Sequence, residues 1–519
     1  MQSPKWYRST HYQNGGHRTM SSARHSLIVG GGFVGLSAAL HLQRMGRRVT
    51  VIDSSPEVSG SASASYGNAG TMAFYANVPV NSPSLFQRLP RMLLNLDKDS
   101  PVSIQPSWHL PKMIPWFILF AWNCRASAVE HTAEKLGALL SKAESGWEPV
   151  WEQSGIDMEN GTMGQHASSA ECQNSPWRVK EGYLILQRTK ADMESSQGGA
   201  DFRKRFIANL NMKRLNSSDE VLELEPHLNP QRCDGGAWYF PDAWCLTDPG
   251  ALLRGLTNGF EAKGGVVRNG LAVVDIQSND GDLNQESGAV RAILDDGTHI
   301  SADEIVIAAG AHSANLVSSS LGEFCPLETE RGYSIQYSKE NSVQNNSNNK
   351  KLLTRAVCDP KGGWIATPMA GGLRVAGKVE LGGGVEAPPT EARFDQLERE
   401  VMGLLSVDPG KRIPSDNWLG FRPSLPDALP VIGRSRKFPD SVYYAFGHQH
   451  VGWTLGGITG QLIAELVLGK ELSVDITPYS LDRFGFTNKE WWRERLRMLF
   501  DNSFQRRKTV PASTRDSYK

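Results

Sequence analysis

The sequence has little of what marks several classes of protein. Its six cysteines lie far apart along 519 residues and form no Cys-x-x-Cys pair. Such spacing indicates neither a zinc site nor a disulfide framework. We therefore expect no metal and expect thiols that stay reduced, which favours a cytoplasmic protein.

An excess of one charge is also absent. Lysine and arginine together number 55, as do aspartate and glutamate. This balance gives no electrostatic reason to expect nucleic acid or an anionic membrane as the main partner. We expect a small molecule as the ligand, and the sequence leaves the oligomeric state open.

Long apolar runs are missing too. The longest extends from Met113 to Trp122 and is interrupted by Pro115. A membrane-spanning helix needs roughly 20 apolar residues, so none is predicted. The aromatic residues of this run would suit a helix at the surface of a bilayer. A buried or partner-facing helix is the simpler interpretation, and peripheral membrane contact near this run is the alternative.

The first 24 residues carry basic side chains and no acidic one. That composition is typical of a mitochondrial presequence. The pair Gly15 and Gly16, and the lack of an apolar face, argue against the amphipathic helix that such a signal needs. We expect residues 1–25 to be a disordered or targeting tail, with a mitochondrial location as the alternative.

A βαβ unit is predicted where the apolar pattern begins. Residues 26–29 form a short apolar run typical of a buried parallel strand. Residues 34–45 show helical spacing and end at Gly46, and residues 49–53 form a second strand. This order is that of a βαβ unit at the very start of the fold.

Two further strand-rich blocks follow, with helical segments between them. Residues 265–310 contain four strand-like runs, and residues 418–469 contain a strand at 442–446 and a helix at 458–468. A long helix is predicted at 133–151 and an exposed loop at 195–200. We therefore expect an α/β protein of two domains that the chain crosses repeatedly.

The segment from Gly30 to Gly35 fits the dinucleotide-binding pattern G-x-G-x-x-G between a strand and a helix. Gly30 permits a tight turn, Gly32 lets the backbone approach a pyrophosphate, and Gly35 lets helix and strand pack closely. The N-terminus of the helix offers N–H donors to the phosphates. Asp53 ends the second strand, where a carboxylate accepts hydrogen bonds from a ribose. The strand, helix, strand and acid order makes dinucleotide binding the firm prediction.

The choice of FAD over NAD depends on the rest of the chain. Residues 59–70 form a small, glycine-rich loop that can run beside a flat ring system. A later strand at 304–308 ends in small residues, and glycines open the last helix. FAD is long enough to touch all three segments. The residues expected to contact it are Gly30, Gly32, Phe33, Val34, Gly35, Asp53, Ser54, Ser65, Asn68, Ala69, Gly70, Val273, Ala309, Gly310, Gly447, Gly452, Trp453 and Thr454.

These segments resemble the D-amino acid oxidase superfamily of flavoproteins, and within it the D-amino acid dehydrogenase small-subunit type. The similarity covers residues 27–484. It implies an α/β protein with a discontinuous Rossmann-like FAD-binding domain and a second α+β substrate domain built on a mixed sheet. The expected division is a tail at 1–25, the FAD-binding domain at 26–95, 244–318 and 415–487, the substrate domain at 96–243 and 319–414, and a tail at 488–519. Gln449 departs from it, because a glycine usually stands at this position in the G-H-G-x-x-G motif of the dehydrogenases. The motifs that carry the resemblance are those at 27–35, 68–70, 181–184, 235–242, 309–313, 330–333, 418–423 and 447–454.

The resemblance implies oxidation of the Cα–N bond of a small amino acid, with a D-amino acid as the leading substrate. The product imino acid would be hydrolysed to a 2-oxo acid and ammonia, and a quinone or other acceptor would reoxidise non-covalent FAD. Arg422, in the W-x-G-x-R-P segment, is the expected grip for the substrate carboxylate, since a guanidinium binds a carboxylate through two parallel hydrogen bonds. Tyr333 would orient the carboxylate or amine, whereas Arg331 is expected to pair with a neighbouring acid.

His448 and His450 are the remaining catalytic candidates. A histidine could accept the amine proton near neutral pH, yet no dedicated base is needed if the amine binds neutral. A structural or flavin-contacting role is therefore the alternative for both. At the level of function, the alternatives are an oxidase of secondary amines such as sarcosine or hydroxyproline, and a flavin-binding scaffold without turnover.

Overall fold

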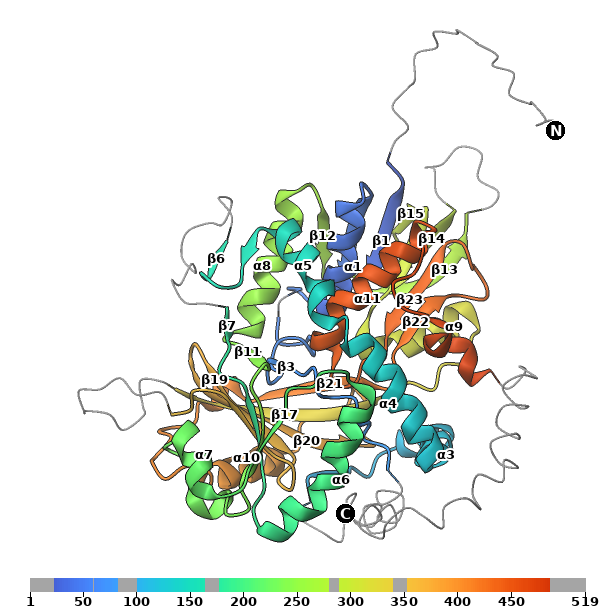
Figure 1. Cartoon of the computed structure of the whole chain (residues 1–519). Helices are drawn as coiled ribbons and strands as arrows, with labels where there is room; N and C mark the ends of the chain where they lie inside the picture. The colour runs from blue at the N-terminus through green and yellow to red at the C-terminus, as the bar shows by residue number, and fades with distance from the viewer. Residues whose placement is uncertain are drawn as a thin grey trace, which may run out of the picture.

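The computed structural model describes residues 23–58, 60–82, 100–163, 177–279, 289–338 and 352–485. Two bodies of structure meet in these residues, one above the other in Figure 1. The upper body is built on a mainly parallel sheet beside helices α1 (Phe33–Arg44) and α11 (Gly452–Val467), and the lower body on a large mixed sheet beside α10 (Glu391–Met402). This architecture confirms the predicted fold class.

The upper sheet has six strands in the described part of the chain. The first five run parallel, and the last is antiparallel to its neighbour. The predicted βαβ unit is confirmed, with each of its three elements starting one residue earlier than expected. The order is β12 (Val266–Asn269), β2 (Arg48–Asp53), β1 (His25–Val29), β16 (Glu304–Ile307), β23 (Val442–Phe446) and β22 (Val431–Arg434).

Both faces of this sheet are covered, which explains why its strands read as continuous apolar runs. Ile28, Val51 and Val306 pack with α1, α11, α5 (Ala143–Ser154) and α8 (Pro249–Ala262). Leu27 and Ile305 face the other side, where a small antiparallel sheet and α9 (Ser313–Leu321) cover them. That small sheet consists of β13 (Val273–Ser278), β14 (Val290–Leu294) and β15 (His299–Ala302), with the expected turn at Gly297 between the last two.

The lower sheet has nine strands in the described residues. Its order is β21 (Trp418–Ser424), β17 (Glu328–Ser338), β20 (Gly372–Leu381), β19 (Trp364–Met369), β18 (Ala356–Asp359), β8 (Tyr183–Leu186), β10 (Ala237–Phe240) and β9 (Lys213–Leu215), and β4 (Val102–Ile104) pairs with β20. Alternate residues of its strands face opposite sides. Tyr333 and Ile335 pack with Phe394 of α10 on one side, whereas Gly332 and Ala376 face the upper body.

Further helices and strands complete the two bodies. They are α3 (Ile114–Asn123), α4 (Ala126–Leu140), α6 (Lys190–Phe206), α7 (Ser218–Leu224), β3 (Thr71–Met72), β5 (Ile156–Asp157), β6 (Thr162–Met163), β7 (Arg178–Val179) and β11 (Trp244–Leu246). Among the described residues, no helix is both long and apolar enough to cross a bilayer.

The two sheets do not follow the expected domain boundaries everywhere. The sequence places residues 415–487 in the FAD-binding domain, but β21 pairs with β17 in the lower sheet. It places α5 in the substrate domain, but this helix packs on α1 and α11 of the upper body. The expected tails at 1–25 and 488–519 lie almost wholly outside the described residues.

Three local predictions were wrong. The single helix at 133–151 is two helices, α4 and α5, which are separated at residues 141–142. Residues 195–200 are part of α6 rather than a loop, and a capping box of Thr189 and Asp192 starts that helix. The helix predicted from 458 begins at Gly452, because its glycines allow close packing: a Cβ at Gly457 would lie 2.6 Å from the backbone of Gly146.

Candidate active site

A cavity of about 890 Å³ lies between the two bodies. The carboxyl ends of parallel strands β1, β2, β16 and β23 meet at one edge of the upper sheet, where ligands bind in folds of this kind. The residues that follow these strands, from Gly30, Asp53, Ala308 and Gly447 onward, therefore converge on the cavity. One face of the lower sheet forms the opposite wall.

Most of the residues predicted as site residues line this cavity. They are Gly30, Gly32, Phe33, Val34, Asp53, Ser54, Ser65, Asn68, Ala69, Gly70, Val273, Ala309, Gly310, Tyr333, Arg422, Gly447, His448, His450, Gly452 and Trp453. Gly35 and Thr454 lie behind the wall. A Cβ at Gly35 would overlap the carbonyl of Gly30, and the Thr454 hydroxyl accepts a hydrogen bond from Ala73 N–H at 3.0 Å.

The nucleotide end of the cavity is shaped by the turn before α1. Gly30 has φ 107, and a Cβ there would overlap the backbone of Ala308. Gly32 is the N-cap residue of the helix and has no side chain to cap the first turn, where Ser65 Oγ accepts from Phe33 N–H at 3.1 Å. Asp53 Oδ2 accepts a hydrogen bond from Gly31 N–H at 2.7 Å, and Oδ1 accepts one from Ser55 N–H at 2.8 Å. Each oxygen keeps a second lone pair for a ribose hydroxyl.

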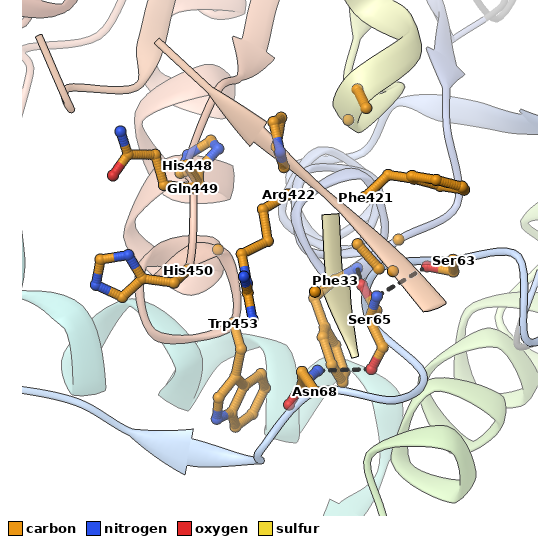
Figure 2. A pocket seen from close by; sticks show the side chains of 18 of the residues that line it. Phe33, Ser63, Ser65, Asn68, Phe421, Arg422, His448, Gln449, His450 and Trp453 are labelled. Carbon is orange, nitrogen blue, oxygen red and sulfur yellow. Dashed lines mark hydrogen bonds between the residues drawn. The ribbon is translucent and has the colours of Figure 1, made fainter. Parts of the chain in front are cut away.

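The small-residue loop beside the cavity is held by its own hydrogen bonds (Figure 2). Asn68 Nδ2 donates to Ser65 O at 2.7 Å, and Ser65 Oγ accepts from Phe33 N–H at 3.1 Å. Arg374, on β20, donates to the carbonyls of Tyr66 and Asn68. Arg374 was missed in the sequence because only strand pairing brings it to the loop.

Helix α11 points its N-terminus at the cavity. Gly452 and Trp453 line the cavity, and no acidic residue lies in the first turn of the helix. Trp453 packs against Phe33, with ring centroids 4.7 Å apart, so the two helices that open onto the cavity are in contact there. The N-terminal partial positive charge of α11 therefore favours negative charge at this end of the cavity.

Arg422 extends from β21 into the cavity, as Figure 2 shows. Its Nη1 donates to Lys378 O at 2.8 Å, and no carboxylate of the described residues lies within ion-pair distance of it. Lys378 has φ 61 at a shift in register between β17 and β20, which directs this carbonyl. Burial lowers the pKa of Arg422, while nearby Glu330 raises it. The guanidinium is therefore a half-buried cation with donors left for an anionic ligand.

Glu330 explains why Arg422 has no tight internal partner. It lies opposite Arg422 in the strand register and faces the same cavity, but its Oε1 accepts a hydrogen bond from Ser424 Oγ at 2.7 Å. Burial raises the pKa of this carboxyl above its usual range. Because Ser424 holds the Glu330 carboxyl, the guanidinium of Arg422 keeps donors for a ligand. The position of Glu330 opposite Arg422 follows only from the register of β17 with β21, which the sequence does not show.

Tyr333 is not placed as predicted. Its side chain is 1% exposed and lies on the face of β17 that packs against α10. Its hydroxyl donates to Glu380 Oε1 at 2.7 Å and accepts from Thr390 N–H at 3.2 Å. The hydroxyl therefore holds α10 to the sheet and does not orient a substrate. Arg331 pairs with Glu380 at 3.0 Å, as expected for its pairing with an acid.

The two histidines are neutral. His448 is buried, its Nε2 lies 2.9 Å from Thr459 Oγ1, and burial lowers its pKa to about 3. His450 borders the open cavity, so water reaches its ring, while surrounding protein atoms and Arg422 lower its pKa to about 4. Imidazoles with such low pKa values are weak bases. They are suited to lining the site rather than to removing a proton from an amine.

Gln449 adopts a left-handed conformation with φ 48. Glycine takes this conformation without strain, whereas other residues pay about 1 kcal/mol or more. The side chain offsets part of this cost, because Nε2 donates to Ser424 Oγ and to Leu425 O, each at 3.3 Å. The departure from the glycine motif thus keeps the backbone of the loop and adds a link to β21.

Buried neutral histidines should make stability fall in acid. His41 is buried like His448, and burial lowers its pKa to about 4. In the unfolded chain both protonate near pH 6.5, so lowering the pH through this value stabilises the unfolded state. The loss should be about 2 kcal/mol for each histidine between about pH 8 and about pH 5. Urea unfolding at several pH values measures it.

The variants His448→Asn and His41→Asn provide the control for this pH dependence. Each should flatten the decline, because an amide does not titrate. A slope equal to that of the wild type in both variants would contradict the assignment.

A substitution at Gly332 tests the role of Arg422 without mutating Arg422 itself. A Cβ at Gly332 would lie 2.5 Å from Cζ and 2.8 Å from Nη1 of Arg422. Gly332→Ala should therefore displace the guanidinium and raise KM for the substrate by about 10- to 100-fold, a loss of about 1.4–2.8 kcal/mol. Flavin content should not change. Gly433→Ala on β22 is the matched control, since its Cβ would meet nothing closer than 3.7 Å. Equal KM values in both variants would show that Arg422 does not bind the substrate carboxylate.

The cavity fits the dinucleotide expected from the sequence. The N-terminus of α1 and the space at Gly32 suit a pyrophosphate, and Asp53 suits a ribose. The loop at 65–70 and the residues after β16 and β23 line the cavity beyond them. The residues that would hold FAD thus belong to the upper body. Arg422 extends into the cavity from β21 of the lower sheet.

Comparisons with known proteins agree with this geometry. The family described as FAD dependent oxidoreductase matches residues 25–466. A D-amino-acid oxidase of Bradyrhizobium diazoefficiens is 32% identical over 90% of this chain and 100% of its own length. A D-amino acid dehydrogenase of Vibrio vulnificus is 24% identical over 89% of this chain and 100% of its own.

Solved structures share the fold. Glycine oxidase from Geobacillus kaustophilus superposes with a TM-score of 0.59 and 21% identity over 89% of this chain and 99% of that one. L-alpha-glycerophosphate oxidase from Mycoplasma pneumoniae, with FAD bound, gives a TM-score of 0.60 and 16% identity over 89% and 98% of the two chains.

Proposed function

The chain belongs to the FAD-dependent oxidoreductase family, and from this premise we propose that it oxidises the Cα–N bond of a D-amino acid. The observation that carries the proposal is Arg422, a half-buried guanidinium that has no carboxylate of the described residues within ion-pair distance, in the cavity that suits FAD. The relatives that are most informative for substrate are named for D-amino acids. The product is an imino acid, which water converts to a 2-oxo acid and ammonia.

The protein contributes binding and orientation to this reaction. Arg422 holds the substrate carboxylate, which fixes one end of the molecule and leaves Cα free to turn toward the upper body. When bound, FAD supplies the acceptor for the two electrons and the hydrogen from Cα. The N-terminus of α11 stabilises negative charge at its end of the cavity. Because His448 and His450 are weak bases, the amine loses its proton to water before it reacts.

One experiment tests the proposed substrate. The purified holoenzyme is mixed anaerobically with D-amino acids, L-amino acids and N-methyl amines, and bleaching of the flavin absorbance is followed. We expect bleaching by D-amino acids and not by their L-enantiomers. Bleaching by sarcosine or hydroxyproline alone would favour the secondary-amine alternative, which the relatives do not favour. A flavin that no substrate bleaches would favour a scaffold.

The flavin is proposed to be non-covalent. Cys358 is the cysteine, among the described residues, that lines the cavity, and burial raises the pKa of its thiol to about 12. A protonated thiol is a poor nucleophile. Precipitation with acid should therefore release all the yellow colour into the supernatant. Colour that stays with the precipitate would indicate a covalent bond.

A quinone is the proposed electron acceptor, although the relative with 32% identity is named an oxidase. The support is the surface of α3 and the segment before it, where Ile114 is 56%, Ile118 65% and Trp108 95% exposed. Such a surface suits peripheral contact with a bilayer, where quinones dissolve. Ile114 and Ile118 belong to the apolar run from Met113 to Trp122, for which the sequence analysis gave peripheral membrane contact as the alternative.

The acceptor is tested by reoxidising the reduced enzyme. A soluble quinone should restore the flavin absorbance at least 10-fold faster than air-saturated buffer, a difference of about 1.4 kcal/mol in activation free energy. Peroxide formed in equal amount to the oxo acid, at the full rate of turnover in air, would show that oxygen rather than a quinone is the electron acceptor. Flotation with liposomes, compared between wild type and Ile118→Asp, tests the membrane contact separately. The proposed location is the cytoplasm, with the mitochondrion as the alternative.

A further inference from the structure

The cavity continues beyond Arg422 across the lower sheet. Gly332 lies beneath the guanidinium on β17, and the next strands in order are β20, β19, β18 and β8, of which the first two appear beside β17 in Figure 1. Neighbouring strands are about 4.8 Å apart. The wall beyond β17 is therefore four strands, or about 19 Å, wide.

Four residues form a straight row on this wall, which we call the apolar row: Ala376, Ile365, Cys358 and Ile185. Ile365 pairs with Ala376, Cys358 with Ile365, and Cys358 with Ile185 in the strand register. Residues directly opposite each other share a face of the sheet. All four line the cavity. The row starts on β20, where Ala376 pairs with Ser334, two residues along β17 from Gly332, and it leads away from the guanidinium.

The side chains of the row and the two tyrosines at its far end carry no charge, and the charge near that end is Arg203. Burial raises the pKa of Cys358 to about 12, so its thiol is neutral. Tyr75 and Tyr183 close the end, with ring centroids 4.7 Å apart, and burial raises the pKa of both hydroxyls. The wall there is made of aliphatic, thiol and aromatic surface.

Charges on the cavity wall disfavour a cationic side chain. Among the described residues that line the cavity, the carboxylates are Asp53, at the nucleotide end, and Glu330, beside Arg422. Arg203 lines the end near Tyr75, and its positive charge acts on Tyr75 and Cys358. An ammonium on the substrate would find no carboxylate along the row and would be repelled by Arg203.

We infer that the apolar row holds the substrate side chain and selects uncharged D-amino acids with long apolar or aromatic side chains. This inference rests on the proposed function, because it takes Arg422 as the grip for the carboxylate. The methyl group of D-alanine ends before the row. The side chains of D-leucine, D-norleucine, D-methionine and D-phenylalanine reach Ala376 and Ile365. Ile365 is the residue that determines specificity.

The first test is a homologous series of substrates for the holoenzyme. The value of kcat/KM should rise from D-alanine through D-2-aminobutyrate and D-norvaline to D-norleucine. Three buried carbons predict a rise of about 50-fold, equivalent to about 2.4 kcal/mol. D-Lysine, which is norleucine with an added ammonium, should be at least about 10-fold poorer than D-norleucine. A best substrate that is D-alanine, D-lysine or D-glutamate would overturn the inference, whereas failure of every D-amino acid would overturn the proposed function.

Binding without turnover separates these two failures further. Straight-chain carboxylates from acetate to hexanoate offer a carboxylate to Arg422 and a chain to the row, but no amine to oxidise. Their binding is followed by the change in flavin absorbance. Dissociation constants should fall about threefold or more with each added carbon. Equal affinity along the series would show that the chain does not lie on the row, whatever the enzyme oxidises.

A variant of Ile365 tests the row directly. Its side chain is half-buried on the cavity wall, so Ile365→Asp places a carboxylate where the substrate side chain would lie. The preference for D-norleucine over D-lysine should reverse. Val266→Asp is the matched control, since Val266 is a β-branched strand residue that is 45% exposed and does not line the cavity. It should keep the wild-type preference. An Ile365→Asp enzyme that keeps its flavin and the wild-type preference would overturn the inference, and if this variant does not fold, the carboxylate series on the wild type decides.

Discussion

Gly32→Glu should give a folded protein without flavin. A Cβ at Gly32 would lie 3.2 Å from Ser65 Oγ, so the first carbon needs only a small shift. The rest of a glutamate would extend into the cavity beside the N-terminus of α1. It would occupy the space for the pyrophosphate and place a negative charge against two phosphates. We expect loss of the yellow colour, measured by the flavin absorbance of the purified protein. We also expect loss of all oxidase and dehydrogenase activity, measured by steady-state assays.

The glycine at position 371 provides the matched control for this loss of flavin. A Cβ at Gly371 would meet no atom within 4 Å, so Gly371→Glu should bind FAD like the wild type. Circular dichroism should show that both variants fold. A yellow, active Gly32→Glu protein would contradict the location of the pyrophosphate. A wild type that binds NAD instead of FAD would contradict the cofactor.

Arg422→Ala should keep the flavin and lose most of the activity. Loss of a buried, charge-assisted pair with the substrate typically costs about 2–5 kcal/mol. This corresponds to a fall in kcat/KM of roughly 30- to 4,000-fold. Folding should survive, because the protein partner of the guanidinium is a single carbonyl, Lys378 O, and Glu330 is already held by Ser424. Steady-state kinetics with the best D-amino acid gives the measurement.

Arg422→Lys and a change of substrate show whether the effect comes from the carboxylate. Lysine should recover only part of the activity, because a point charge does not reproduce the two parallel hydrogen bonds. Amines without a carboxylate should be poor substrates of the wild type and nearly unaffected by the change. Arg399→Ala, on the outer side of α10, should behave like the wild type. Full activity of Arg422→Ala on its best D-amino acid would show that another residue binds the substrate carboxylate.

The nucleotide end of the site was accessible from sequence because its signals are local. The glycines after β1, the helix that follows and Asp53 lie within 24 residues, from Gly30 to Asp53. Each glycine has a steric reason that the pattern already implies. Parallel strands place the later loops at the same edge, so Gly310 and Gly447 also fall where the sequence predicts.

The substrate wall was not accessible in the same way, because strand register determines it. Tyr333 and Gly332 are adjacent in sequence but face opposite sides of β17, and no local pattern shows which side carries the cavity. Glu330 and Arg374 reach the site only through pairing with β21 and through contact with the loop at 65–70. The start of α11 was misplaced because glycines indicate a turn in a sequence, whereas here they let the helix approach α5 and α1.

The discontinuous upper sheet also affects how the protein is made. Strand β16 pairs with β1 across 278 positions of sequence and with β23 on its other edge. A ribosome must therefore release residues up to 467 before the sheet, α11 and the flavin cavity exist together. Such distant pairings form slowly and leave strand edges exposed meanwhile. FAD, which binds only the finished fold, pulls the equilibrium toward it. The amount of riboflavin available to a cell during synthesis is thus expected to influence how much of the chain escapes aggregation and degradation.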